Sequence, residues 1–175
     1  RHCECRDGRL WAEGAPVDLI YKRVLISELI ERGGMEQPVV RAVRERAACL
    51  VNPFRCKILH KKASLAVLSD ERNHHLLDAA ARAAVLAHVP WTRVVEERTT
   101  VRGGREVDLV ETVAREKDRL VLKPNDEYGG KGIVLGWEVD QAAWEDALRT
   151  ALAEPYIVQE RVALLNGSLT IESAP

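Results

Sequence analysis

A lysine at the end of an apolar run and a cluster of glycines downstream are the residues best suited to chemistry. The run Leu120–Lys123 ends at Pro124, and three glycines and a second lysine follow as Gly129–Gly132. Glycines let backbone N–H groups come close to an anion, and a lysine adds a point charge. The segment predicts a phosphate-binding loop between two antiparallel strands.

The spacing of this loop separates it from two common phosphate-binding motifs. Lys131 is followed by Gly132 rather than by Ser or Thr, and no helix follows, so the loop is not a Walker A motif. The missing helix also excludes a dinucleotide fingerprint. An ordinary wide hairpin turn remains the alternative, but a solvated lysine would be unusual at the end of so apolar a strand. We therefore expect Lys123 to point inward, toward an anion.

A second polar site ends the last expected strand, residues 156–162. There Gln159 and Glu160 follow an apolar stretch. Such a strand end could offer an acceptor to the amino group of adenine and a backbone donor to the ring. The alternative is an exposed strand end that carries polar residues.

Taken in order, Lys123, Gly129–Gly132 and Gln159–Val162 resemble the central ATP-binding part of ATP-grasp enzymes. Residues 17–23 and 52–63 are similar to the circularly permuted ATP-grasp proteins related to glutathionylspermidine synthase. The resemblance covers most of residues 5–165. It implies an ATP-grasp-like fold with an upstream α/β segment and an incomplete C-terminal lobe.

The resemblance also implies roles for individual residues. Lys123 would meet the α- and β-phosphates, and Arg23 would face the substrate. An earlier lysine would join the phosphate site, and the sequence does not choose between Lys61 and Lys62, which could equally lie on a solvated helix face. The remaining roles are a phosphate lid, formed by Gly129, Gly130, Lys131 and Gly132, and an adenine-binding strand, in which Gln159 offers its side chain and Glu160 and Val162 their backbone.

The activity implied by the resemblance is ATP-dependent ligation of a carboxylate to an amine through an acyl-phosphate. ATP and Mg²⁺ would be the cofactors, and small carboxylates, amines or a peptide the substrates. The family's metal ligands follow the adenine-binding strand, but only 13 residues follow Val162, and of these only Asn166 and Glu172 have a suitable type. We therefore expect a fragment, or a chain with residues omitted, that is inactive alone. The alternatives are a non-catalytic nucleotide-binding or scaffold module and a structural domain with a chance glycine-rich turn.

Composition limits the remaining possibilities. The 175 residues carry 26 Lys and Arg against 27 Asp and Glu, which gives no support for nucleic-acid binding. No apolar run reaches the length of a membrane span, and we expect a cytoplasmic protein. The chain begins at Arg1, which suggests an internal portion of a longer protein. No metal site is expected. We interpret His74 and His75 as a polar helix start rather than as metal ligands with His60. The cysteines, at Cys3, Cys5, Cys49 and Cys56, are interpreted as reduced thiols.

Alternating strands and helices predict an α+β or α/β chain. We expect an upstream α/β segment over 1–62, a nucleotide-binding lobe over 63–165 and a tail or lobe start over 166–175. The strands are expected at 2–12 (a hairpin around Asp7-Gly8), 17–21, 48–51, 94–95, 120–124, 133–137 and 156–162. The helices are expected at 25–31, 39–46, 58–68, 76–88, 107–117 and after an N-cap at Asp140, with a loop over 99–106.

Overall fold

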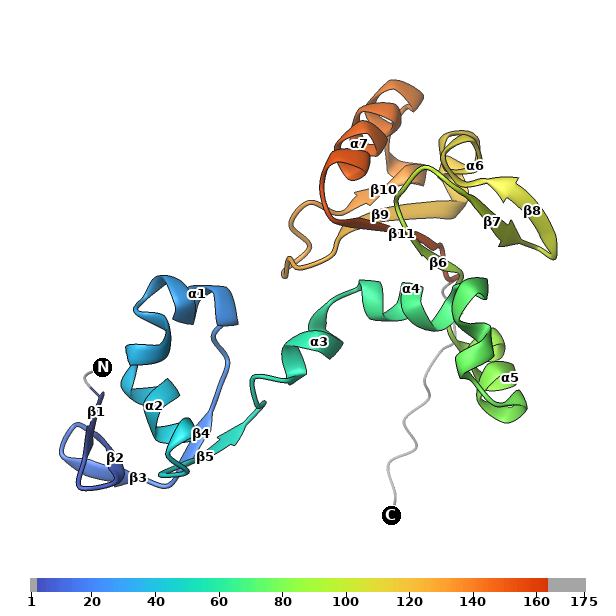
Figure 1. The fold of residues 1–175 in the computed structure, drawn as a ribbon. Coiled ribbons are helices and arrows are strands. Elements are labelled where there is room, and N and C mark those ends of the chain that lie inside the picture. The colour runs from blue at the N-terminus through green and yellow to red at the C-terminus, as the bar shows by residue number, and fades with distance from the viewer. Residues whose placement is uncertain (1–2, 164–175) are drawn as a thin grey trace, which may run out of the picture. The chain divides into compact units, whose positions relative to one another are not determined.

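The computed structural model describes residues 3–163 and divides after His60 into two compact units (Figure 1). Both units combine helices with small sheets, so the chain is a mixed α+β protein, as the alternation of elements predicted. Within residues 3–163, none of the helices combines the length and the apolar character that a membrane crossing requires.

The first unit begins with an antiparallel meander of three short strands. The predicted hairpin around Asp7-Gly8 is confirmed, and both turn residues have positive φ, 52° and 70°. This backbone suits a two-residue turn between twisted strands. Leu10 is buried, and its strand packs against α2 (Pro38–Arg44). The strands are β1 (Cys3–Arg6), β2 (Arg9–Ala12) and β3 (Ala15–Val17).

A parallel pair of strands completes the first unit. The single strand predicted over residues 17–21 is wrong, because the chain changes sheets at Asp18: Val17 pairs with β2 and Leu19 with β5. The run at residues 48–51 does form a strand, but Cys49 and Val51 are exposed rather than buried. The strands are β4 (Leu19–Tyr21) and β5 (Cys49–Val51), joined through α1 (Ile26–Glu31), η1 (Gly34–Glu36) and α2 (Pro38–Arg44).

The helix predicted over residues 58–68 is broken in two. α3 (Cys56–His60) ends the first unit, and α4 (Ala63–Ser69) begins after Lys61 and Lys62. The break has a tertiary cause, because the N–H groups of Lys62 and Ala63 donate to the backbone and side-chain oxygens of Asn125. These two donors are therefore lost to a continuous helix.

The second unit is built on a four-stranded antiparallel sheet in the order β10-β9-β11-β6. The predicted strand over 120–124 is confirmed, and the strand expected over 156–162 ends at Glu160. The central strand β11 pairs with β9 on one side and β6 on the other. The strands are β6 (Thr92–Val94), β9 (Leu120–Pro124), β10 (Val134–Leu135) and β11 (Tyr156–Glu160).

The loop predicted over residues 99–106 is wrong, because β7 (Thr99–Arg102) and β8 (Arg105–Asp108) form a hairpin. Gly103 and Gly104 form its turn with φ of 57° and 78°, so the glycines join two strands instead of ending them. The helical elements of this unit are α4, η2 (Glu71–Leu76), α5 (Ala79–His88), α6 (Leu109–Arg115), η3 (Lys117–Arg119), η4 (Gly136–Glu138) and α7 (Gln141–Ala153).

The helix predicted after Asp140 is confirmed as α7, together with its N-cap. The Asp140 carboxylate accepts a hydrogen bond from the N–H of Ala143 at 2.8 Å. Trp144 and Leu148 are buried, Leu152 is 38% exposed, and Ala151 takes the next buried position. The buried stripe thus follows i, i+4, i+7 along the helix.

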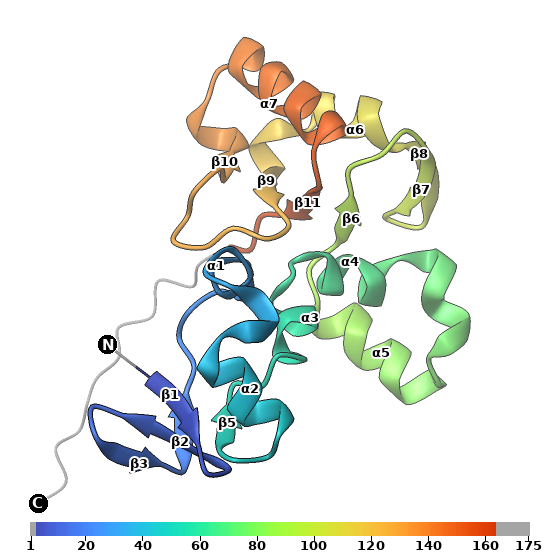
Figure 2. The same ribbon diagram turned by 60° about the vertical axis from the view of Figure 1, so that its left-hand side comes forward.

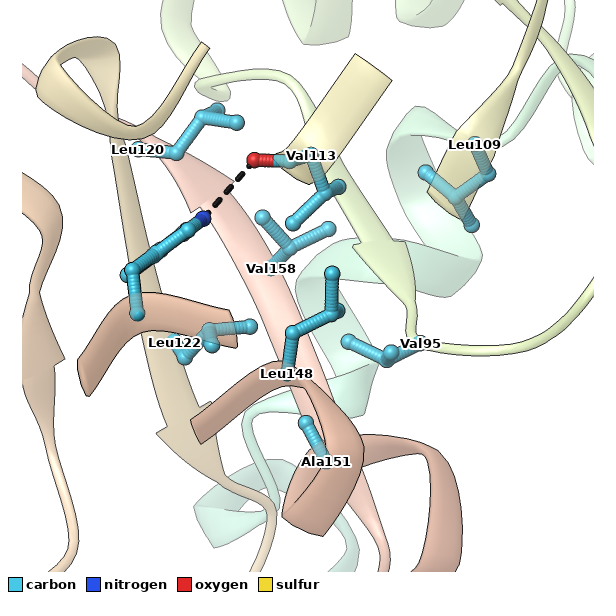
Figure 3. Packing of buried hydrophobic residues seen from close by; sticks show 9 residues of the cluster. Val95, Leu109, Val113, Leu120, Leu122, Leu148, Ala151 and Val158 are labelled. Carbon is cyan, nitrogen blue, oxygen red and sulfur yellow. Dashed lines mark hydrogen bonds between the residues drawn. The ribbon is translucent and has the colours of Figure 1, made fainter. Parts of the chain in front are cut away.

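The core of the second unit lies between α6, α7 and one face of the sheet. Figures 1 and 2 show these two helices on one side of the sheet and α4 on the other. In Figure 3, sheet residues Leu120, Leu122 and Val158 pack against Val113 and Leu148 of the helices. Because side chains alternate along a strand, the residues between these core positions face the other side of the sheet.

Buried ion pairs join η2 to β6 and to the β7–β8 hairpin. The Arg93 guanidinium, which is buried, donates to Glu71 Oε2 at 2.6 Å and to Thr100 Oγ1 at 2.6 Å. Arg98 lies 2.9 Å from a carboxylate oxygen of Asp70. Burial raises the pKa values of both carboxyls, but hydrogen bonds and nearby arginine charges outweigh it and hold each pKa below its ordinary value.

This network predicts a loss of stability in acid. The lowered pKa values mean that the carboxylates stabilise the fold above their ordinary values of 4.5 for Glu71 and 3.8 for Asp70. Stability should fall as the pH drops through the lowered values, since protonation breaks the pairs. In urea denaturation, Glu71→Gln should be less stable than wild type at pH 7, and the difference should narrow below pH of about 4. An unchanged difference would contradict a structural role for this charge. Glu111→Gln, in an exposed pair with Arg115, is the control and should change stability by less than about 0.5 kcal/mol.

A glycine in η4 is needed for close packing. A Cβ added to Gly136 would collide with the carbonyl oxygen of Lys117, and it would lie 2.6 Å from the carbonyl carbon of Lys117 and 3.0 Å from the carbonyl oxygen of Leu120. These contacts are with backbone, which cannot move aside as a flexible side chain would. We expect Gly136→Ala to lower the free energy of unfolding by about 3 kcal/mol, measured by urea denaturation. The control is Gly103→Ala, where a Cβ meets nothing within 4 Å and only the positive φ is strained, at a cost of about 1–2 kcal/mol. Equal losses in the two variants would show that η3 and η4 are not packed as described.

Candidate functional site

The face of the sheet opposite the core carries a hollow. Lys123 and Gln159 face it from adjacent strands, since Leu122 and Val158 point into the core between their neighbours. The hollow has a volume of about 720 Å³, within the roughly 300–1,000 Å³ of small-molecule sites. Its lining is formed by Val121, Lys123, Leu135, Trp137, Glu138, Gln159, Glu160, Arg161, Val162 and Ala163.

Lys123 is the cation inside this hollow. Its Nζ donates a hydrogen bond to Gln159 Oε1 at 2.7 Å. Burial lowers the pKa of Lys123, and the positive charge of Lys62 lowers it further. An ammonium group has three donors, and the bond to Gln159 uses one of them. An anion in the hollow would therefore find donors and would relieve the repulsion between the two lysines.

The two candidate lysines before α4 differ in their surroundings. Lys61 lies 3.2 Å from the carboxylate of Asp126, so an acidic partner already balances its charge. The Nζ of Lys62 donates to the carbonyl oxygen of Glu127 at 2.6 Å and acts on the pKa of Lys123. Of these two lysines, only Lys62 is among the causes that lower the pKa of Lys123, which makes it the better candidate for a second cation, although neither Lys61 nor Lys62 belongs to the lining of the hollow.

The glycine-rich segment joins β9 to β10 as the sequence predicted. Gly129, Gly130 and Gly132 all have φ between 65° and 81°, a conformation that side chains disfavour. Lys131 is 78% exposed and lies 3.4 Å from the Glu127 carboxylate. The loop is therefore compatible with a lid, but Lys131 lies outside the set of residues that line the hollow. Its contact with phosphate stays a prediction.

Gln159 is bound within the protein at both ends of its amide. Its Oε1 accepts from Lys123, and its Nε2 donates to Thr92 Oγ1 at 2.9 Å. Gln159 lies on β11, where it pairs with Val121 of β9 on one side and with Thr92 of β6 on the other. The arrangement makes Gln159 an anchor for the Lys123 ammonium, and its predicted bond to an adenine amino group would have to share Oε1 with that lysine.

The other predicted adenine-binding residues lie at the rim of the hollow. The N–H of Glu160 donates to the carbonyl oxygen of Trp91 at 2.9 Å, and Val162 is 62% exposed. The sequence did not point to two further residues of the hollow, Trp137 and Arg161. The guanidinium of Arg161 lies 4.2 Å from the centre of the Trp137 indole ring. Trp137 stood at the end of an expected strand, and no sequence signal tied it to Arg161.

The other singled-out residues lie elsewhere. Arg23 belongs to the first unit, where it is exposed in the segment after β4, and its role toward a substrate stays a prediction. His74 and His75 lie near the end of η2, not at a helix start as expected. Asn166 and Glu172 are outside the described residues. Across residues 3–163, no group of three or more His, Cys, Asp or Glu side chains is arranged to hold a metal ion.

No protein-family model matches the chain, and no curated protein matches it significantly. The functional assignment therefore depends on the chemistry of the hollow. Its main feature is the half-buried ammonium of Lys123, which uses one of its three donors to bind Gln159 and whose pKa is lowered in part by the charge of Lys62. A glycine-rich loop follows the end of the strand that carries Lys123.

Proposed function

We propose that the hollow beside Lys123 binds the phosphates of ATP, and that the chain is the nucleotide-binding part of an ATP-grasp-type carboxylate–amine ligase. The observation that carries the proposal is Lys123 itself. Its ammonium lies in a hollow on the sheet and donates a hydrogen bond to the neutral amide of Gln159, and the charge of Lys62 contributes to lowering its pKa. A polyphosphate satisfies two neighbouring cations better than a ligand with a single charge does.

The residues of the chain would serve the reaction by binding and charge compensation. Phosphoryl transfer depends on positioning and on stabilising negative charge, with little need for a nucleophilic side chain. Lys123 and Lys62 supply that charge, and Gln159 holds the Lys123 ammonium in place. The glycine-rich loop would cover the phosphates and exclude water. Among residues 3–163, no group of three or more His, Cys, Asp or Glu side chains is arranged to hold a metal ion, and no step is assigned to Mg²⁺.

A non-catalytic nucleotide-binding module is the second candidate. It is favoured by the same observation, since the Lys123 ammonium in the hollow suits phosphate binding whether or not a reaction follows. Under this reading the hollow binds nucleotide as a structural or regulatory ligand.

The test that separates the two candidates is release of ADP from ATP and Mg²⁺. The chain is incubated with a panel of amino acids, polyamines and small peptides, and ADP is measured by a coupled assay. ADP release that depends on both a carboxylate and an amine and is lost in Lys123→Met would support the ligase and contradict the expectation that this chain is inactive alone. ATP binding without substrate-dependent release is the result expected of the chain alone under either candidate, and a chain that binds no ATP would overturn both.

A further inference from the structure

The residue that fixes the backbone at Lys62 lies in a distant part of the sequence. Asn125 follows the end of β9, two positions after Lys123. Its backbone oxygen accepts from the N–H of Lys62 at 3.1 Å, and its side-chain Oδ1 accepts from the N–H of Ala63 at 2.9 Å. Its own N–H donates to Pro155 at 2.8 Å, which ties it to the chain entering β11.

We propose that Asn125 is a positioning residue that holds Lys62 next to Lys123, so that the two ammonium groups form one site for a polyphosphate. The inference rests on the proposed nucleotide site and adds a residue to which neither the sequence reasoning nor the resemblance gave a role. Because Lys62 has no side-chain cap of its own, Asn125 provides the cap for α4 from the strand that carries Lys123. The start of the helix and the end of β9 are thereby fixed to each other.

Two like charges at one site repel each other and need a rigid support. The charge of Lys62 does act on Lys123, whose pKa is lowered by burial and by this neighbour. Free lysine side chains would move apart in water, so a site that keeps them together must hold their backbones. Asn125 holds the backbone of Lys62, and the carbonyl oxygen of Glu127 receives its ammonium at 2.6 Å.

The test compares Asn125→Ala, Lys62→Met and the double variant by two measurements. The first is an NMR titration of the ¹³C-labelled Lys123 side chain, which needs no nucleotide. Asn125→Ala removes the bond to Ala63 and keeps the backbone bond to Lys62. If Asn125 acts through Lys62, this variant should shift the Lys123 midpoint upward by less than Lys62→Met does, and the double variant should shift it no further than Lys62→Met. The second is calorimetric affinity for ATP, where Lys62→Met should lose about tenfold, Asn125→Ala less, and the double variant no more than Lys62→Met.

The matched control is Asn73→Ala, which removes the amide bonded to the carbonyl oxygen of Val67 near the other end of α4. This variant should leave the Lys123 titration unchanged. Asn125→Ser, whose shorter side chain does not reach Ala63, replaces Asn125→Ala if the alanine variant fails to fold. An unchanged Lys123 midpoint in both Asn125 variants, or losses of affinity that add fully to those of Lys62→Met, would overturn the inference. If wild type binds no ATP, the proposed function fails, while the titration still decides the role of Asn125.

Discussion

Replacing Lys123 by methionine should weaken ATP binding by about 10- to 100-fold, because a hydrogen bond to a charged group contributes roughly 1.5–3 kcal/mol. Methionine keeps an unbranched apolar stem over the sheet and removes only the ammonium. The variant also leaves Gln159 Oε1 without its donor, so a small loss of stability accompanies the loss of affinity. Isothermal titration calorimetry at constant salt measures the effect.

Lys117→Met is the matched control for this prediction. Lys117 is also largely buried but does not line the hollow, and its Nζ donates to the carbonyl oxygens of Gly136 and Val139, each at 3.0 Å. We expect it to reduce stability while leaving the ATP affinity unchanged. Wild-type affinity in Lys123→Met, or an equal loss in both variants, would rule out a specific phosphate contact at Lys123.

Trp144→Ala should produce the largest loss of stability in the second unit, about 3–5 kcal/mol. Trp144 is 0% exposed in the core, and its indole N–H donates to the carbonyl oxygen of Val113 at 2.9 Å. The dashed line in Figure 3 marks this bond, which joins α7 to α6. Truncation removes the packing of a whole indole and leaves a buried carbonyl oxygen without its donor.

Chemical denaturation of Trp144→Ala and Leu152→Ala would test this on the same helix. Leu152 is 38% exposed, so its truncation should cost less than about 1.5 kcal/mol. Similar losses for the two variants would contradict the placement of the core between α6, α7 and the sheet.

Local signals in the sequence predicted the elements whose causes are local. The Asp7-Gly8 turn, the Asp140 cap and the apolar run of β9 each depend on residues adjacent in the chain, and all three are present. The break before α4 was not predictable in this way, because Asn125, some 60 positions downstream, removes the helical donors. The β7–β8 hairpin was missed because a glycine pair permits both a loop and a tight turn.

In the candidate site, too, the sequence predicted the features with local causes and missed those that depend on long-range contacts. Lys123 and the glycine-rich loop stood out because residue type and neighbours alone made them unusual. The sequence did not predict that Lys123 bonds to Gln159, because this bond depends on how β9 and β11 are aligned. The alignment of strands and the stacking of Arg161 on Trp137 are long-range properties that a single sequence does not encode in any local pattern.

The most direct test of the nucleotide site is a calorimetric titration of the wild-type chain with ATP, repeated in the presence of saturating inorganic triphosphate. The account predicts saturable binding at one site, which triphosphate displaces because the phosphates supply the main contacts to Lys123 and Lys62. No saturable heat at several temperatures, or ATP binding that triphosphate leaves unchanged, would contradict a phosphate site in this hollow.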